Sequence, residues 1–447
     1  LSYAFVQVTP DLKKNKEDGN VEVVFKIAPG EKVMIRNVII SGNTRTLDRV
    51  IRREIFLGPG DMYSLTDLTD SRSALGRLGY FDANTIEEKR VNSSTMDLVV
   101  KLKEASTGTL QAGGGYGSYG GFLIQLSVND RNVFGSGIDI GVKLDRSELT
   151  YNYVFNISNP RLNDTDFSGN FAINISEYEY NDYTVLSSGV GVGLGHRFTR
   201  NINGGVNYGY SDNSYNGIKD ANLTAGQEQF YEDYIKSSVT FSIRYDDTDD
   251  YYLPRKGIAT SQSLEYAGLS GDAEFIKSRT SFSAYKGLKE YLSFDIIARY
   301  KARFKYAYEN GYLPIAERFY MGGLRSVRGF SSYSLAPNYK DNEGKTVRIG
   351  GEYTGSNSLE LSFPLVPKAK MRLVTFVDYG SIGGTRGYKN IAKQNTLSDD
   401  LITRGGYGLG LEWFSPVGPI QLIFARALDE EKGDNTSFFE FSMGQRF

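Results

Sequence analysis

The chain has 447 residues, of which 40% are apolar and 23% are charged, a composition that excludes a disordered protein. A formal net charge of −2 and the lack of long Lys/Arg runs give no general attraction to nucleic acid, so no nucleic-acid partner is expected. The chain has no cysteine, which excludes disulfides and thiolate metal sites and is compatible with an oxidising periplasm.

Residues 1–30 are expected to form a hairpin, with strands at 2–9 and 21–28 joined by a polar Lys/Asn/Asp loop. This hairpin has no helices of its own. We therefore interpret it as the C-terminal remnant of a preceding copy of the module that follows. On this interpretation the chain starts inside a repeat and is truncated at its amino terminus, which also accounts for the missing signal peptide.

The pattern of residues 31–105 predicts a small α+β module with its elements in the order β-α-α-β-β. A short apolar strand at 33–40 precedes two helices, for which Thr46 and Ser64 are the expected caps. Gly79 is expected to end the second helix. Two further strands are expected at about 85–91 and 96–102, separated by a turn-forming Asn-Ser-Ser sequence.

Residues 106–447 are expected to form a transmembrane antiparallel β-barrel. The chain's 50 Gly, 32 Tyr and 26 Phe favour many strands, and apolar and polar residues alternate in runs such as 292–308 and 122–129. These runs reach the roughly nine to eleven residues that a tilted membrane strand requires, whereas strands of soluble sandwiches are shorter. At about twenty residues per strand with its connection, 14 to 18 strands fit, and we expect sixteen. The fold class is therefore mainly β.

Several short motifs then point to one family. Ser41-Gly-Asn-Thr-Arg-Thr46 and Leu78-Gly-Tyr-Phe81 resemble a polypeptide-transport-associated (POTRA) domain. The motif at 327–330 resembles the signature of the BamA family of outer-membrane β-barrel assembly factors, and an earlier segment, at 244–257, resembles that family's strand-turn motif. The signature consists of Val327, Arg328, Gly329 and Phe330, and the strand-turn motif of Arg244, Asp246, Asp249, Pro254 and Gly257.

The resemblance implies a function as well as a fold. It implies a sixteen-stranded barrel in the outer membrane of a Gram-negative bacterium, with POTRA domains in the periplasm. Such a protein receives unfolded outer-membrane barrel proteins and inserts them through a weak seam between its first and last strands, without ATP. Its expected partners are these unfolded proteins, accessory assembly lipoproteins and outer-membrane lipids.

The seam is expected between a glycine-rich first strand and an aromatic last strand. Glycines contribute no side-chain packing and lose more entropy on ordering, so this edge is held less firmly than an ordinary strand. The same glycines could instead serve only to curve the barrel. The expected residues are Leu110, Gly113, Gly114 and Gly115 in the first strand, and Phe439, Phe441, Met443 and Phe447 on the membrane face of the last.

A long loop, at about 308–358, carries the Arg328 motif and is expected to fold into the lumen. A guanidinium inside a lumen needs carboxylate partners, and the resemblance implies Glu360 and Asp378 as the acceptors. Asp378 is expected to follow a strand at 373–377. The alternative is an extracellular loop with a solvated arginine.

Two further patterns in the sequence, an acidic turn and a single histidine, predict neither a metal site nor an active site. Asp246 to Asp250 lacks the Gly and Glu of an EF-hand, so a solvated turn is favoured and no metal is expected. His196, the only histidine, has no motif pairing it with a nucleophile, so neither an enzyme nor a cofactor is expected.

A two-partner-secretion type exporter remains the main alternative function, and a passive porin leaves the POTRA module unexplained.

Overall fold

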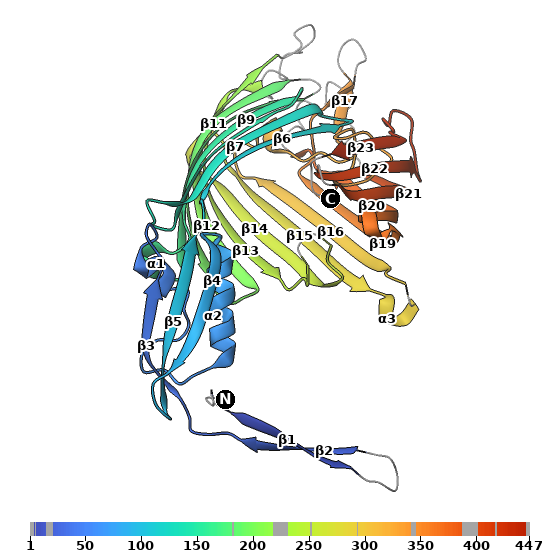
Figure 1. Ribbon diagram of the computed structural model, residues 1–447. Helices are drawn as coiled ribbons and strands as arrows, with labels where there is room; N and C mark the ends of the chain where they lie inside the picture. The colour runs from blue at the N-terminus through green and yellow to red at the C-terminus, as the bar shows by residue number, and fades with distance from the viewer. Residues whose placement is uncertain are drawn as a thin grey trace. The chain divides into compact units, whose positions relative to one another are not determined.

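The computed structural model describes residues 4, 6–14, 21–180, 183–217, 231–250, 253–292, 294–340, 346–386, 401–415 and 418–443. The chain divides into two compact units, and each is described by itself. Unit 1 comprises Leu1–Thr109, Asn129–Ile140 and Asn159–Thr165, and unit 2 comprises Leu110–Val128, Gly141–Ser158 and Asp166–Phe447. The predicted fold class, mainly β with an antiparallel barrel after an α+β module, is confirmed (Figure 1).

The chain begins with a two-stranded hairpin of β1 (Gln7–Lys14) and β2 (Val21–Ala28), which pair from Gln7 and Ala28 to Lys14 and Val21. The first strand was expected at 2–9, so that prediction was wrong by about five residues at each end. An isolated ribbon has no buried face to select apolar residues, and backbone pairing therefore extends into the polar segment that was expected to be loop.

The α+β module contains a three-stranded sheet in the order β3-β5-β4 and two helices. Strand β3 (Met34–Ser41) runs parallel to β5 (Thr95–Glu104), and β4 (Phe81–Arg90) runs antiparallel to it. The helices are α1 (Asp48–Arg52) and α2 (Leu65–Leu78). Their core consists mainly of Ile35, Ile51, Leu68, Leu75, Met96, Leu98 and Val100, all almost fully buried.

Helix α2 ends as expected, whereas α1 begins differently. Ser64 accepts a hydrogen bond from the backbone N–H of Asp67 (3.3 Å), and Gly79 closes the helix in the left-handed conformation. Thr46 does not cap α1, because Leu47 occupies that position without a side-chain cap. The Thr46 hydroxyl instead accepts a hydrogen bond from Nδ2 of Asn132 (2.9 Å) in unit 1.

A single carboxylate organises the Ser-Gly-Asn-Thr-Arg-Thr segment between β3 and α1. Glu104 accepts hydrogen bonds from the backbone N–H groups of Thr44 (3.0 Å), Arg45 (2.9 Å) and Thr46 (2.6 Å). Gly42 has a φ of +90°, and a Cβ there would collide with the carbonyl of Leu102. The motif therefore lets the loop wrap around the end of β5.

These hydrogen bonds change the acidity of Glu104. Burial alone raises the pKa of this carboxyl, but the Thr44 hydroxyl and the three N–H donors outweigh burial and lower the pKa from 4.5 to about 2. A depressed folded-state pKa stabilises the fold above the unfolded-state value, and this stabilisation is lost as the pH falls from about 4.5 towards 2.

Sixteen strands of the described residues close into an antiparallel barrel, coloured from teal at β6 to red at β23 in Figure 1. The expected number of strands is confirmed. None of the described helices is long and apolar enough to cross a membrane. The barrel strands are β6 (Gly108–Gly117), β7 (Gly121–Val133), β8 (Ile138–Arg146), β9 (Thr150–Asn159), β10 (Phe167–Glu179), β11 (Thr184–Arg197), β12 (Ile202–Asn216), β13 (Tyr234–Asp246), β14 (Lys256–Gly271), β15 (Phe275–Gly287), β16 (Ile297–Glu309), β19 (Tyr353–Val366), β20 (Met371–Gly383), β21 (Ile402–Ser415), β22 (Gly418–Ala427) and β23 (Phe439–Met443).

Alternation along the strands separates an apolar outer face from a charged lumen. On β16, Tyr300, Phe304 and Tyr306 are exposed on the outside, whereas Arg299 is buried inside. The strand begins at Ile297, not at Leu292 as the alternation suggested, because the preceding residues form the short helix α3 (Lys289–Leu292). Short 3-10 turns lie at Leu162–Asp164, Ile315–Glu317 and Pro367–Ala369.

We predict that Glu104→Gln destabilises the α+β module at neutral pH and flattens its acid dependence. The amide cannot reproduce the charge-assisted bonds, so wild type should lose stability between about pH 4.5 and 2 while the variant changes little there. The measurement is urea unfolding at several pH values, followed by the helical circular-dichroism signal. Glu87→Gln, which removes an exposed carboxylate from β4, is the control. Parallel acid profiles for wild type and Glu104→Gln would refute the assignment.

Candidate functional site

The connection between β16 and β19 folds into the barrel and fills one end of its lumen. It covers 310–352, slightly less than the expected 308–358, because β19 already begins at Tyr353. It contains the small hairpin of β17 (Asn338–Lys340) and β18 (Thr346–Arg348). Buried apolar residues of this lumenal loop pack with wall residues such as Phe275 and Ile382, and they include Leu313, Ile315, Phe319, Met321, Val327, Phe330 and Leu335.

Arg328 is bound to the barrel wall through its backbone N–H, its Nε and its Nη2. Its Nε donates to Asp378 Oδ2 (2.7 Å), and its Nη2 donates to Asp378 Oδ1 (2.7 Å) and to Ser358 Oγ (2.8 Å). The backbone N–H of Arg328 also donates to Asp378 (3.0 Å), and Glu360 lies 2.9 Å from Nη2. The structure therefore brings together the three residues that the sequence analysis grouped.

Asp378 lies in the middle of β20, not after a strand as expected. Its side chain is fully buried on the lumenal face, where Phe376 is its neighbour two residues earlier. The guanidinium carbon of Arg328 lies 3.5 Å from the centre of the Phe376 ring, so the cation also stacks on an aromatic face. The expected strand end was wrong because inward apolar residues hid the alternation.

Glu360 is shared by several cations that the sequence analysis did not assign to the site. Arg299 stands directly opposite Glu360 across β16 and β19, with a closest approach of 3.5 Å, and Lys301 lies 3.1 Å away. Arg299 also makes a two-pronged contact with Glu412 at 2.9 Å. The alternation signals that these side chains face the lumen, but only the strand register shows which of them meet.

The other residues of the motif, Val327, Gly329 and Phe330, allow the loop to pack closely against the barrel wall. Val327 and Phe330 are fully buried. Gly329 has a φ of +98°, and a Cβ there would lie 2.8 Å from the carbonyl carbon of Arg426 on β22. Glycine is therefore required both by the backbone conformation and by the approach to β22.

A second ionic anchor holds the first part of the lumenal loop and was not predicted. Glu317 accepts hydrogen bonds from Lys236 on β13 (2.6 Å) and from the buried Lys277 on β15. Glu265 of β14 lies 3.3 Å from Lys236 and completes the group. The loop is thus bound to β13 and β15 near its start and to β19 and β20 near its tip.

The first and last strands of the barrel, β6 and β23, pair only briefly within the part of the chain that the structure describes. Among the described residues, β23 and β6 share one registered pair, Ser442 with Gly117. Beside it, Ser118 N–H donates to the Phe441 carbonyl (3.0 Å), and Phe441 N–H donates to Ser118 Oγ (3.3 Å). Strands β11 and β12, in contrast, pair along Thr184–Arg197.

The expected seam residues lie on these two strands. Leu110, Gly113 and Gly114 are exposed on β6, and Gly115 is buried. On β23, Phe439 is exposed on the outer side, Phe441 and Met443 are half-buried in phase with it, and Glu440 points inward. Phe447 lies outside the described residues.

The strand-turn motif forms the connection from β13 to β14. Arg244 pairs with Asp246 (2.6 Å), and Asp249 accepts hydrogen bonds from the backbone N–H groups of Arg255 (2.8 Å) and Lys256 (3.0 Å). Gly257 has a φ of +105°, and Pro254 lies within the turn, partly exposed. The carboxylates thus bind backbone amides and an arginine, which supports a structural role.

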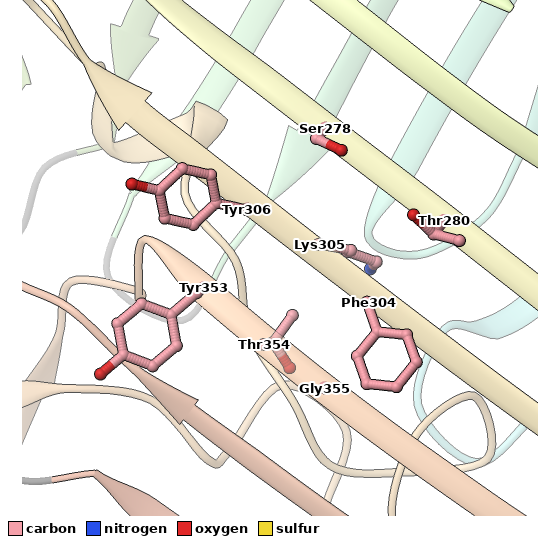
Figure 2. Close-up of a pocket in the computed structure, with 8 residues that line it drawn as sticks. All are labelled: Ser278, Thr280, Phe304, Lys305, Tyr306, Tyr353, Thr354 and Gly355. Atoms are coloured by element: carbon pink, nitrogen blue, oxygen red, sulfur yellow. The ribbon is translucent and has the colours of Figure 1, made fainter.

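The outer wall carries one shallow hollow, of about 240 Å³, across β15, β16 and β19. Figure 2 shows the rings of Phe304, Tyr306 and Tyr353 around it. Gly355 lies under Phe304, where a Cβ would come within 3.2 Å of the ring. The hollow faces outward from the barrel, away from the lumenal loop.

Comparison with known proteins gives two family matches. The Omp85 superfamily domain matches residues 132–447, and the POTRA family, described as a surface antigen variable number repeat, matches 33–105. The outer membrane protein assembly factor BamA of Nitratidesulfovibrio vulgaris is 31% identical over the whole chain, and that of Neorickettsia risticii is 28% identical. The chain spans 55% and 59% of the length of these two relatives.

A solved structure shows the same fold. The crystal structure of BamA from Haemophilus ducreyi lacking POTRA domains 1–3 superposes with a TM-score of 0.83 at 23% identity. The superposition covers 100% of this chain and 90% of that one.

We predict that Arg328→Lys loosens the lumenal loop. Lysine keeps the charge but cannot bind both oxygens of Asp378 and Ser358 at once, so the free energy of unfolding should fall by about 1–3 kcal/mol. Urea unfolding in detergent micelles measures the change. Arg325→Lys, three residues away on the exposed side of the same loop, should change the stability by less than about 0.5 kcal/mol. Equal effects of the two variants would contradict the proposed anchor.

Proposed function

Because this chain belongs to the Omp85 superfamily, we propose that it is the barrel-bearing part of an outer-membrane protein assembly factor. It lies in the outer membrane, and its POTRA module belongs to the periplasmic side. In this proposal the protein receives unfolded β-barrel proteins from the periplasm and inserts them into the membrane through the seam between β6 and β23.

The observation that carries the proposal is the single registered pair between β6 and β23 among the described residues. In hydrocarbon, each unpaired backbone group costs several kcal/mol, so a wall that opens must have few such bonds to break. Pairing along a full strand, as between β11 and β12, would make opening far more costly. The seam is therefore the place at which this wall opens most readily.

An opened seam supplies its own means of assembling a client. The freed edge of β6 presents backbone N–H and C=O groups, which can pair with a strand of an incoming protein by β-augmentation. Each new strand satisfies the edge exposed by the one before it, and the client leaves when its own ends pair. No step requires a catalytic side chain or ATP.

The ionic anchors of the lumenal loop have a supporting role in this proposal. Arg328, with Glu360 and Asp378 as acceptors, keeps the loop bound to β19 and β20 while the seam changes. Gly329 allows the backbone to turn closely past β22. The wall at β19 and β20, with β20 three strands from β23, thus stays organised during the reaction.

Accessory lipoproteins on the periplasmic side and outer-membrane lipids complete the expected set of partners. The alternative, a two-partner-secretion exporter, uses a barrel of the same family for a dedicated substrate. The full-length relatives reported above are named as assembly factors, which favours insertion over export.

We predict that a disulfide across the seam stops insertion. Gly117→Cys with Ser442→Cys uses the registered pair, and the chain has no other cysteine. Liposomes containing the reduced variant should accelerate folding of an unfolded outer-membrane barrel protein, and oxidation should abolish that acceleration, because β6 can no longer part from β23.

The matched control is a disulfide between Gly191→Cys and Gly209→Cys, which face each other in the firmly paired β11 and β12. This crosslink should leave the acceleration unchanged in both redox states. Full activity of the oxidised seam variant would exclude insertion through the seam.

A further inference from the structure

We propose that the segment 329–334 of the lumenal loop is a strap that holds both edges of the seam together, with Tyr333 as its positioning residue. The strap contacts the chain just before β23 on one side and the turn just after β6 on the other. Its significance for insertion rests on the function proposed above, but the contacts and the closed state that they favour do not.

On the side of the last strand, the strap forms a short antiparallel pairing with the segment that leads into β23. Ser437 N–H donates to the Gly329 carbonyl (3.0 Å), and Ser331 N–H donates to the Asn435 carbonyl (2.8 Å). Phe330 and Thr436 form the bridge between these two bonds. The segment that leads into β23 is therefore bound to the loop by two backbone hydrogen bonds on either side of this bridge.

A side-chain contact strengthens the same junction. The Ser334 hydroxyl donates to the Asn435 carbonyl (3.2 Å), so this carbonyl accepts hydrogen bonds from both Ser331 and Ser334. The buried Glu440 on β23 faces the Ser332 hydroxyl and the backbone N–H of Leu324. The lumenal loop therefore contacts both the segment that precedes β23 and β23 itself.

On the side of the first strand, the contact is aromatic. The ring of Tyr333 lies 5.3 Å from that of Tyr119, and Tyr178 of β10 lies 6.3 Å from Tyr333. The Tyr178 hydroxyl also donates to the Tyr119 hydroxyl (3.4 Å). Tyr119 directly follows Ser118, whose N–H makes the backbone bond to Phe441, so the contact fixes the end of β6 at the point where the seam closes.

The backbone of Tyr333 is consistent with a constrained role. Its φ is +58°, a left-handed conformation that is unfavourable for a residue with a Cβ. Such a conformation persists only where surrounding contacts maintain it, and here those contacts are the two tyrosine rings and the backbone pairing of the strap. The strap thus crosses the seam beside the registered pair of Ser442 with Gly117.

The test measures the seam itself, without a client. Spin labels on Ile124→Cys and Phe424→Cys report the separation of β7 and β22, because both positions are exposed on the outer face and flank the seam. The chain has no other cysteine. The labelled full chain is reconstituted in lipid nanodiscs, and the distance distribution is measured by pulsed electron paramagnetic resonance.

Tyr333→Gly removes the ring and also relieves the backbone conformation, so the variant is expected to fold. The population with a widened separation should rise about two- to tenfold, the change expected for the loss of the one aromatic pair that reaches the first strand, Tyr333 with Tyr119. Tyr119→Ala should have a similar effect. The double variant should add little to either, because both substitutions remove the same contact.

Lys370→Gly is the matched control, since Lys370 has a similar φ of +54° in the turn between β19 and β20, away from the seam. It should leave the distances unchanged. Unchanged distances in Tyr333→Gly and Tyr119→Ala would overturn the strap, as would an equal widening in Lys370→Gly. If the seam widens while client folding in liposomes does not respond, the strap stands and the proposed insertase function fails.

Discussion

The need to pair every backbone group in hydrocarbon governs this structure. A sheet that crosses a membrane has no water to satisfy its edges, so it must close on itself. Sixteen strands achieve this closure, and pairing is continuous along neighbours such as β11 and β12. At the junction of β6 and β23 the described residues form one registered pair. Among these residues, closure is therefore concentrated in a small number of bonds, and most of the β6 edge is not paired with β23.

The lumen imposes a second requirement. Its charged side chains are enclosed, so they must neutralise each other. Glu360 meets Arg299, Lys301 and Arg328, and Asp378 binds Arg328 through both oxygens. Glu317 similarly joins Lys236 on β13 and Lys277 on β15. Removing one partner from such a group leaves a buried charge, which costs more than the pair itself contributes. These groups therefore specify where the lumenal loop lies.

The two requirements meet in the lumenal loop. Its Arg328 is anchored on β20, in the firmly paired part of the wall, whereas its next residues contact the chain beside both edges of the seam. A loop held at one end by ions and at the other by a few backbone bonds and tyrosine rings can release the seam without leaving the lumen. This division places the strong interactions where the wall is static and the weaker ones where the proposed function needs motion.

Much of this could be predicted from local sequence pattern. The period-two alternation in β16 distinguishes the outward Tyr300 and Phe304 from the inward Arg299, because each strand residue faces the side opposite to its neighbour. The cap at Ser64 and the turn at Gly79 follow from local backbone chemistry, whereas Thr46 was misassigned because Glu104, about sixty residues later, binds the amides of that loop.

Contacts between distant segments could not be read in this way. The alternation does not reveal that Arg299 faces Glu360, that Asp378 lies within β20, or that Tyr333 reaches Tyr119, since each depends on strand register or on the path of a long loop. The sequence by itself thus determined the strands, their faces and the motifs. Only the tertiary structure decided which charges meet and where the described residues of β6 and β23 pair, because these pairings join residues that no local periodicity relates.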